Sequence, residues 1–192
     1  PFSKKNPSVK ELKLLKKLIN ELSLSIQKDD IYLVGLSKKI SLSLKINFID
    51  RKKIRIGRLE SINMLLYKSL KYIEKQNKYP DYMIFSNYDY LNRPLEMFKE
   101  LISLAISKGN DFTFSAFKDY GHYWRINSNE IIEPTDPLLL PREKMQNPTY
   151  KALYGLGSIS ATWLIRQKKM IGGKVGIYNI KSDKYTLRIR NE

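Results

Sequence analysis

Hydrophobic positions recur with helical spacing in three parts of the chain. In residues 9–22 leucines and isoleucines return every third or fourth position, directly after a serine and a glutamate spaced as in a capping box, Ser8 and Glu11. The same period returns in residues 60–75 and again between Pro94 and Gly109. Proline suits the first turn of a helix and glycine the position just past its end. The pattern therefore predicts three amphipathic helices.

Short apolar runs alternate with these helices, at residues 31–34, 82–85 and 112–117. They are too continuously apolar for strands with one solvated face. Helices that alternate with buried strands predict a three-layer α/β/α fold, in which the runs share one mostly parallel sheet. Ligands of such sheets bind beyond the carboxyl ends of the strands, so a site is expected in the segments that follow the three runs. These segments are residues 35–38, 86–93 and 118–124.

The regular pattern stops after Ile126. Residues 127–150 carry four prolines and show no clear period, and long excursions of this kind tend to be functional or to contact partners. Residues 162–170 fit a short helical or extended piece, and residues 174–180 resemble a strand. We expect one domain, residues 1–192, from which residues 127–160 protrude as an arm or hairpin.

The composition limits which kinds of chemical site the chain can form. The 192 residues are 42% hydrophobic and include no cysteine and one histidine, His122, which excludes disulfides, thiolate metal sites and multi-histidine metal sites. No apolar run is long enough to span a bilayer, so we expect a cytoplasmic protein without a membrane partner. The net charge of +16 comes from lysines scattered along the whole chain and no nucleic-acid motif is present, so a solvated lysine surface is favoured over a nucleic-acid partner.

Several segments resemble, in order and spacing, the acylneuraminate (CMP-sialic acid synthetase-like) cytidylyltransferases. They are residues 80–94, 110–117 with 122–126, the Gln-x-Pro-x-Tyr motif of residues 146–150, and the glycine-containing stretches 157–159 and 172–178. The resemblance implies a nucleotide-diphospho-sugar transferase-like fold. It also implies a homodimer formed through the arm and a role in sialic acid or polysaccharide biosynthesis. The family's reaction joins CTP to a nonulosonic or octulosonic acid, giving a CMP-sugar and pyrophosphate with the help of Mg²⁺.

The resemblance also marks candidate substrate-binding residues, without assigning a catalytic one. Arginines in this set would suit a sugar carboxylate through a bidentate contact, or are ordinary surface residues. Asp89 is either a ligand near the nucleotide or a capping aspartate, and His122 is better explained as a packed residue than as a catalytic one. The candidates are Ser86, Asn87, Asp89, Arg93, Arg142, Gln146, Tyr150, Gly157, Ser158 and Lys174.

Two departures from the family's pattern affect the expected activity. The family's A-R-x-G-S-K-R nucleotide loop would precede Pro1 and is not in this sequence, and its I-D-I-D metal aspartates correspond to residues 187–190, which read Leu-Arg-Ile-Arg. Arginine cannot coordinate Mg²⁺, so Arg188 and Arg190 speak against the family's metal here. We therefore predict a cytidylyltransferase-like protein that is inactive or incomplete. The alternatives are a non-catalytic homologue that binds a nucleotide sugar or a partner and, more distantly, a glycosyltransferase module of similar topology.

Overall fold

The computed structural model describes residues 8–35, 38–57, 60–135, 141 and 149–189. Among these residues, no helix is both long and apolar enough to cross a membrane. In chain order the elements are α1 (Val9–Ser23), η1 (Lys28–Asp30), β1 (Tyr32–Val34), α2 (Lys38–Leu44), β2 (Asn47–Ile49), α3 (Ile62–Glu74), β3 (Tyr82–Phe85), α4 (Met97–Lys108), β4 (Phe112–Asp119), β5 (Trp124–Ile126), β6 (Ile132–Pro134), β7 (Thr149–Ala152), β8 (Ser158–Ala161), α5 (Thr162–Arg166), β9 (Val175–Ile180) and η3 (Asp183–Thr186).

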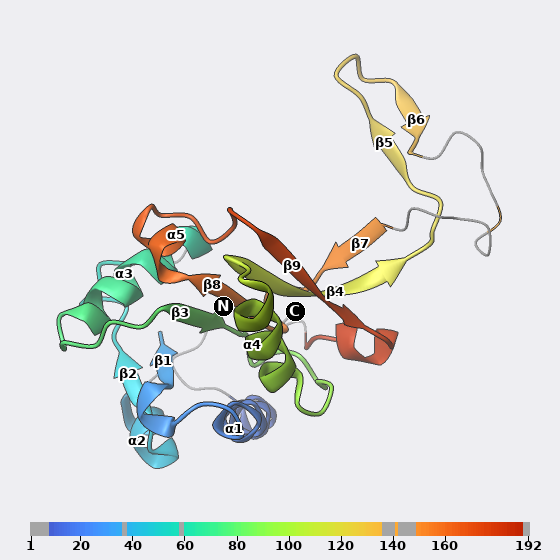
Figure 1. Ribbon diagram of the computed structural model, residues 1–192. Helices are drawn as coiled ribbons and strands as arrows, with labels where there is room; N and C mark the ends of the chain where they lie inside the picture. The colour runs from blue at the N-terminus through green and yellow to red at the C-terminus, as the bar shows by residue number, and fades with distance from the viewer. Residues whose placement is uncertain (1–7, 36–37, 58–59, 136–140, 142–148, 190–192) are drawn as a thin grey trace.

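A five-stranded mixed sheet forms the centre of the molecule (Figure 1). Strand β8 lies between β3 and β4 and is antiparallel to both, so β3 and β4 point the same way without touching. Strand β9 pairs with β4 in parallel, and β7 pairs antiparallel with the end of β4. Three strands therefore share one direction and two oppose it. Sequence analysis did not predict β8, whose four residues are all buried but include two serines.

Helices cover both faces of this sheet, as the sequence predicted. On one face Ile84 of β3 packs with residues of α4 and with Leu18 of α1. On the other face Met83, Phe85, and Phe112 and Phe114 of β4 pack against α3 and α5. Successive strand side chains point to opposite faces, so runs that are apolar at every position can fill two cores at once. The three-layer α/β class is confirmed.

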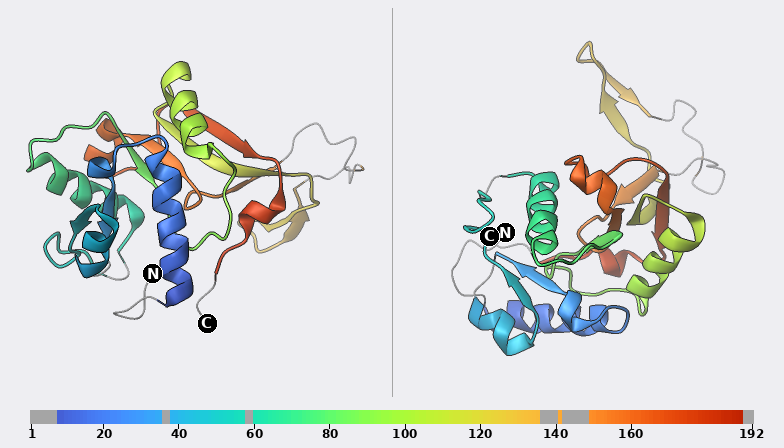
Figure 2. Two further views of the ribbon diagram at one scale, coloured as in Figure 1. Left: turned by 90° about the horizontal axis from the view of Figure 1, so that it is seen from below. Right: turned by 60° about the vertical axis from the view of Figure 1, so that its left-hand side comes forward.

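The first apolar run, by contrast, does not join the main sheet. Among the strands of the described residues, β1 pairs with β2 alone, in parallel, and the two form a separate sheet beside α1 and α2 (Figure 2). Tyr32 and Val34 contact the rest of the molecule through a side-chain cluster that includes Met83 and Ile73. The prediction that residues 31–34 share a sheet with β3 and β4 is thus wrong, and α2 and β2 were not predicted.

Helix ends follow local sequence signals closely. Ser8 and Glu11 form the predicted capping box of α1, each side chain accepting a hydrogen bond from the other residue's backbone N–H. Gly109 ends α4 in the left-handed conformation, with φ 58°. The start of α4 differs from prediction, because the helix begins at Met97 and Pro94 lies one turn before it.

The arm is a β5–β6 hairpin that stands away from the sheet (Figure 1). Its apolar side chains are exposed: Trp124 by 61%, Ile126 by 70% and Ile132 by 65%. His122, which we expected to pack beside its aromatic neighbours, is exposed as well. The predicted arm extended to residue 160, but β7 and β8 already belong to the main sheet. Leu138, Leu139 and Leu140 lie outside the described residues.

Candidate functional site

The segment after β3 lies at the carboxyl edge of the sheet, where a site was expected. Its residues 89–91 are held by the segment that follows η3. The Leu91 N–H donates to the Leu187 carbonyl at 3.1 Å, and the Ile189 N–H donates to the Asp89 carbonyl at 2.8 Å. Between these bonds Tyr90 and Arg188 form an antiparallel bridge. Two segments far apart in the sequence are therefore joined by backbone hydrogen bonds at this edge.

An ion pair joins the two segments. Arg188 donates from Nε to Asp89 Oδ2 at 3.0 Å and also from Nη2 to the same oxygen. The guanidinium stacks 5.1 Å above the ring of buried Tyr90. Hydrogen bonding to Asp89 raises the pKa of Arg188, which stays a permanent cation. The other carboxylate oxygen, Asp89 Oδ1, is buried and accepts no hydrogen bond from the described residues.

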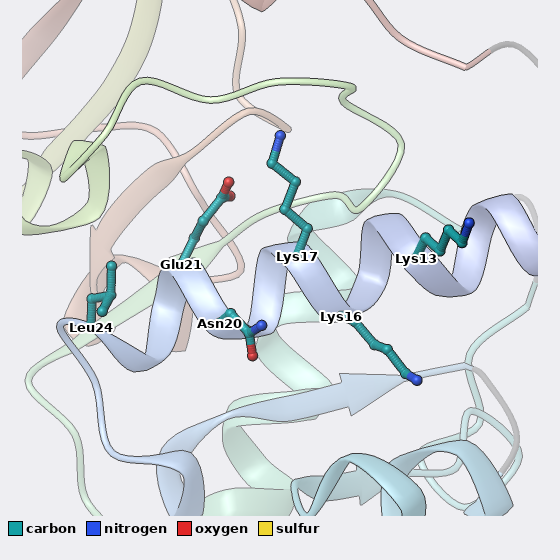
Figure 3. Close-up of a pocket in the computed structure, with 6 residues that line it drawn as sticks. All are labelled: Lys13, Lys16, Lys17, Asn20, Glu21 and Leu24. Carbon is teal, nitrogen blue, oxygen red and sulfur yellow. The ribbon is translucent and has the colours of Figure 1, made fainter.

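Helix α1 holds the same segment from the other side. The Tyr88 hydroxyl donates to Glu11 at 3.3 Å, and Lys17 Nζ donates to the Leu91 carbonyl at 3.2 Å. Figure 3 shows Lys17 and Glu21 on the side of the helix that faces this segment, with Lys16 and Asn20 on the opposite side. The segment after β3 thus lies between α1 and residues 187–189, and it is hydrogen-bonded to both.

Arg93 anchors this arrangement from within. Its side chain is 2% exposed and its Nη1 lies 3.6 Å from Glu21 Oε2. Nε donates to the Leu156 carbonyl at 3.2 Å, and Nη2 donates to the Asn87 carbonyl and, at 3.4 Å, to Ser86 Oγ. Burial raises the pKa of Glu21 and lowers the pKa of Arg93, while the attraction between them opposes both shifts. The guanidinium donates its hydrogen bonds to protein groups, so the geometry favours a structural role for Arg93 over binding of a sugar carboxylate.

Other candidates lie beneath the edge rather than on it. Ser86 Oγ donates to the Leu156 carbonyl at 2.9 Å, and the Asn87 N–H donates to the Gly155 carbonyl at 2.7 Å. A Cβ on Gly157 would come within 2.8 Å of Met97 and 2.9 Å of Leu101, so this glycine allows α4 to pack closely. Ser158 is 1% exposed. Hydrogen bonding explains Ser86 and close packing explains Gly157, whereas the buried Ser158 hydroxyl has no hydrogen-bond partner among the described residues.

The structure does not bring Lys174 to the candidate site. It precedes β9, which runs parallel to β3 and β4, so it lies at the opposite edge of the sheet. Its Nζ donates to the Lys108 carbonyl at the end of α4, and its N–H donates to Asp111 Oδ2 at 2.8 Å. That backbone hydrogen bond and one from Trp163 lower the pKa of Asp111. Lys174 therefore fixes a turn, and its placement among the substrate-binding residues is not supported.

The remaining candidates lie on β7 or outside the described residues. Tyr150 lies on β7, opposite Lys118 of β4, and is 45% exposed. Arg142, Gln146 and Arg190 lie outside the described residues. The site that the structure assembles consists of residues 86–93 and 187–189, with α1 behind them.

The residues of this site do not fit a metal ion. Throughout the described ranges, no three histidine or carboxylate side chains lie together as a metal site requires. Asp89 is the one carboxylate of residues 86–93 and 187–189, and it is hydrogen-bonded to the Arg188 guanidinium. Mg²⁺ needs oxygen ligands, which a guanidinium cannot supply. Arg188, an arginine where the resemblance led us to expect a metal-binding aspartate, is thus paired with the carboxylate that could otherwise bind a metal ion.

Sequence reasoning missed the supporting residues of the site. Lys17 and Glu21 stand four positions apart on α1, which suggests a solvent-facing pair within the helix. In the structure both reach the segment after β3 instead. Tyr90, whose ring also lies 5.9 Å from the Arg93 guanidinium, had no signal beyond being aromatic.

No family model matches the chain, and no curated protein sequence matches it. Solved structures do resemble it. 4-Diphosphocytidyl-2C-methyl-D-erythritol synthase of Anaerococcus prevotii matches with a TM-score of 0.61 at 14% identity, over 92% of this chain and 79% of that one. CMP:2-keto-3-deoxy-manno-octonic acid synthetase in complex with CTP matches with a TM-score of 0.53 at 6% identity, over 88% and 78%. HddC of Yersinia pseudotuberculosis in complex with GMP-PN matches with a TM-score of 0.51 at 13% identity, over 94% and 80%. The chain therefore shares the α/β fold of these proteins.

Proposed function

We propose that this protein is a cytidylyltransferase-like protein of acidic-sugar activation, in which an ion pair stands where the family places metal-binding carboxylates. The pairing of Asp89 with Arg188 carries the proposal. It places a fixed positive charge at the carboxyl edge of the sheet, where ligands of such folds bind. Two of the structural neighbours are named for cytidylyl chemistry, and one of these acts on an acidic eight-carbon sugar.

Arg188 has the properties of a phosphate-binding residue. A guanidinium carries five N–H donors, and Arg188 directs its Nε and Nη2 to Asp89. Its side chain is 45% exposed, so donors remain for a ligand. Because Asp89 and Tyr90 hold the side chain in place, little conformational entropy is lost when it binds an anion. Arg188 thus supports nucleotide phosphate binding.

The same observation supports the non-catalytic alternative. A guanidinium neutralises phosphate charge but does not arrange the ligand oxygens around a metal ion. A protein that retains the fold and loses the metal would bind a nucleotide or nucleotide sugar and transfer the nucleotidyl group poorly. Binding and turnover must therefore be measured separately.

CTP is expected to bind with an affinity that is the same with Mg²⁺ and with EDTA. Arg188→Gln should weaken binding by roughly tenfold or more, because a hydrogen bond to a charged group contributes about 1.5–3 kcal/mol. Isothermal titration with CTP, CMP, ATP and GTP checks this and reports base preference.

The matched control is Arg125→Gln. Arg125 on the arm also forms an exposed pair with a carboxylate, 2.8 Å from Glu133, and its replacement removes the same charge. It should leave CTP binding unchanged. Equal weakening by both substitutions, or an affinity that requires Mg²⁺, would contradict the role assigned to Arg188.

We further propose that the arm forms a homodimer. Trp124, Ile126, Ile131 and Ile132 are each more than half exposed on one short hairpin, with Ile131 at 57%. Contiguous apolar surface of this kind marks protein contacts. The partner that fits this proposal is a second copy of the chain, because the resemblance to the cytidylyltransferases implies one.

Replacement of both Trp124 and Ile126 by serine is expected to convert the dimer into a monomer at micromolar concentration. Burial of a large apolar side chain contributes about 1.5–3 kcal/mol, so loss of two weakens association by a hundredfold or more, on the order of 3–6 kcal/mol. Sedimentation equilibrium measures the change.

Leu95→Ser with Ile106→Ser is the control for this experiment. These residues are 83% and 63% exposed in the α4 region and lie away from the arm. The control protein should remain a dimer. A monomeric unmodified protein under the same conditions would refute the proposed homodimer.

A further inference from the structure

Helix α1 (Val9–Ser23) carries lysines on the exposed side of its first half. Its buried side carries Leu15, Leu18 and Ile19. The exposed side carries Lys10, Lys13 and Lys16, whereas Lys17 turns toward the segment after β3. Two exposed aliphatic residues lie near the ends of the helix, Val9 at 73% and Leu24 at 72%. A hollow of about 490 Å³ lies beside α1 and includes residues from both of these sides: Lys13, Lys16, Lys17, Asn20, Glu21 and Leu24 (Figure 3).

A second hollow, of about 320 Å³, adjoins the first and collects lysines from three elements. Lys16 comes from α1, Lys28 from η1 and Lys45 from the residue after α2. Ser43 and Asn20 add polar groups to its lining. Three lysines from separate elements thus border one concavity, a lining that suits a multiply charged anion.

The lysines of this face are not neutralised by the protein. Lys13, Lys16, Lys28 and Lys45 form no ion pair with the described residues. The carboxylates of α1 are used elsewhere, since Glu11 bonds to the Ser8 N–H and to Tyr88, and Glu21 pairs with Arg93. In η1, Asp30 pairs with Lys78 at 2.9 Å, which leaves Asp29 as the nearby free carboxylate of the described residues. The face therefore keeps a net positive charge.

We propose that this α1–η1–α2 face docks on an anionic lipid surface, with a headgroup phosphate in the pocket formed by Lys16, Lys28 and Lys45. Clustered lysines attract anionic lipid headgroups, and the exposed Val9 and Leu24 add apolar side chains that can enter the headgroup region. The face has neither the arginines that read base edges nor the aromatic rings that stack on bases, which argues against nucleic acid. The expectation of no membrane partner is revised by this proposal, which is independent of the proposed nucleotide chemistry.

The test is co-sedimentation of the full chain with vesicles. The protein is expected to bind vesicles of phosphatidylglycerol mixed with phosphatidylcholine, and not pure phosphatidylcholine, at low ionic strength. The variant with Lys16, Lys28 and Lys45 all changed to glutamine should bind the anionic vesicles roughly a hundredfold more weakly, at about fivefold for each lysine. Leu24→Ser should weaken vesicle binding by about tenfold and leave binding to heparin unchanged.

The control changes Lys75, Lys151 and Lys169 to glutamine. These exposed lysines end α3, lie in β7 and follow α5, so the variant loses the same charge on other surfaces. It should bind the vesicles like the unmodified protein, and both variants should have the same melting temperature. Equal losses in both variants would show a non-specific effect of net charge and overturn the proposal. Two other results would overturn the proposal. One is that the variant with Lys16, Lys28 and Lys45 changed loses binding to duplex DNA but still binds vesicles. The other is that inorganic phosphate alone occupies the site in place of vesicles.

Discussion

Incubated with CTP, Mg²⁺ and a panel of nonulosonic and octulosonic acids, the protein is expected to release pyrophosphate at least about a thousandfold more slowly than a cytidylyltransferase with an intact carboxylate pair. A thousandfold corresponds to about 4 kcal/mol of transition-state stabilisation, the size of contribution made by a metal ion that neutralises developing phosphate charge. A coupled assay for pyrophosphate measures the rate.

The reason is electrostatic and geometric. At the carboxyl edge of β3, the Asp89 carboxylate accepts two hydrogen bonds from Arg188. A metal ion would have to displace a bonded guanidinium and would meet its repulsion. The guanidinium itself attracts phosphate oxygens without holding attacking and leaving groups in fixed positions around one centre.

Arg188→Asp provides the informative variant. It replaces the cation by a second carboxylate beside Asp89 and should create measurable affinity for Mg²⁺ where the unmodified protein has none. Arg166→Asp, at an exposed arginine that pairs with Glu74 on another surface, controls for the change in charge. Turnover by the unmodified protein within tenfold of an intact enzyme would show that the metal site has been misplaced.

Arg93→Met is expected to lower the free energy of unfolding by about 3–5 kcal/mol, because it leaves the partly buried Glu21 carboxylate and the carbonyls of Asn87 and Leu156 without their buried donor. The Arg93 side chain is 2% exposed and its guanidinium joins α1, the segment after β3 and the carbonyl of Leu156. Urea denaturation at neutral pH measures the loss. Arg166→Met should cost less than about 1 kcal/mol, since that arginine is 43% exposed in its pair with Glu74.

The combination of Glu21→Gln with Arg93→Met separates charge from packing. The double variant should be more stable than Arg93→Met alone, because no carboxylate is left without its partner. If Arg93→Met costs less than 1 kcal/mol, the ion pair does not anchor the segment after β3 and the account of the site fails.

Signals confined to a few neighbouring residues were predictable from the sequence. The capping box at Ser8 and Glu11 and the left-handed Gly109 depend on backbone hydrogen bonds within one turn. The three-layer class was predictable as well, because the runs 82–85 and 112–117 are apolar at nearly every position and need cover on both faces.

Features set by distant contacts were not predictable. Strand β8 lies between β3 and β4, and its backbone groups bond to these two strands. Its own sequence, which includes two serines, does not reveal these partners. The Asp89–Arg188 pair joins positions 99 residues apart. Lys174 was misplaced because a motif gives the order of residues along the chain and not the edge of the sheet at which a strand begins.

The position of β8 also dictates an order of assembly. Strands β3 and β4 are adjacent in the sequence of strands but cannot bond to each other, because β8 occupies the space between them. During synthesis both must wait, with unpaired backbone edges, until the arm has been made and residues 158–161 have emerged. Open strand edges are templates for association with other chains, and sheet contacts between distant residues form slowly. The middle of the sheet thus closes only after residues 158–161 emerge, and β9 is added to the other edge of β4 later still. The nascent chain is most prone to aggregation just before β8 is inserted.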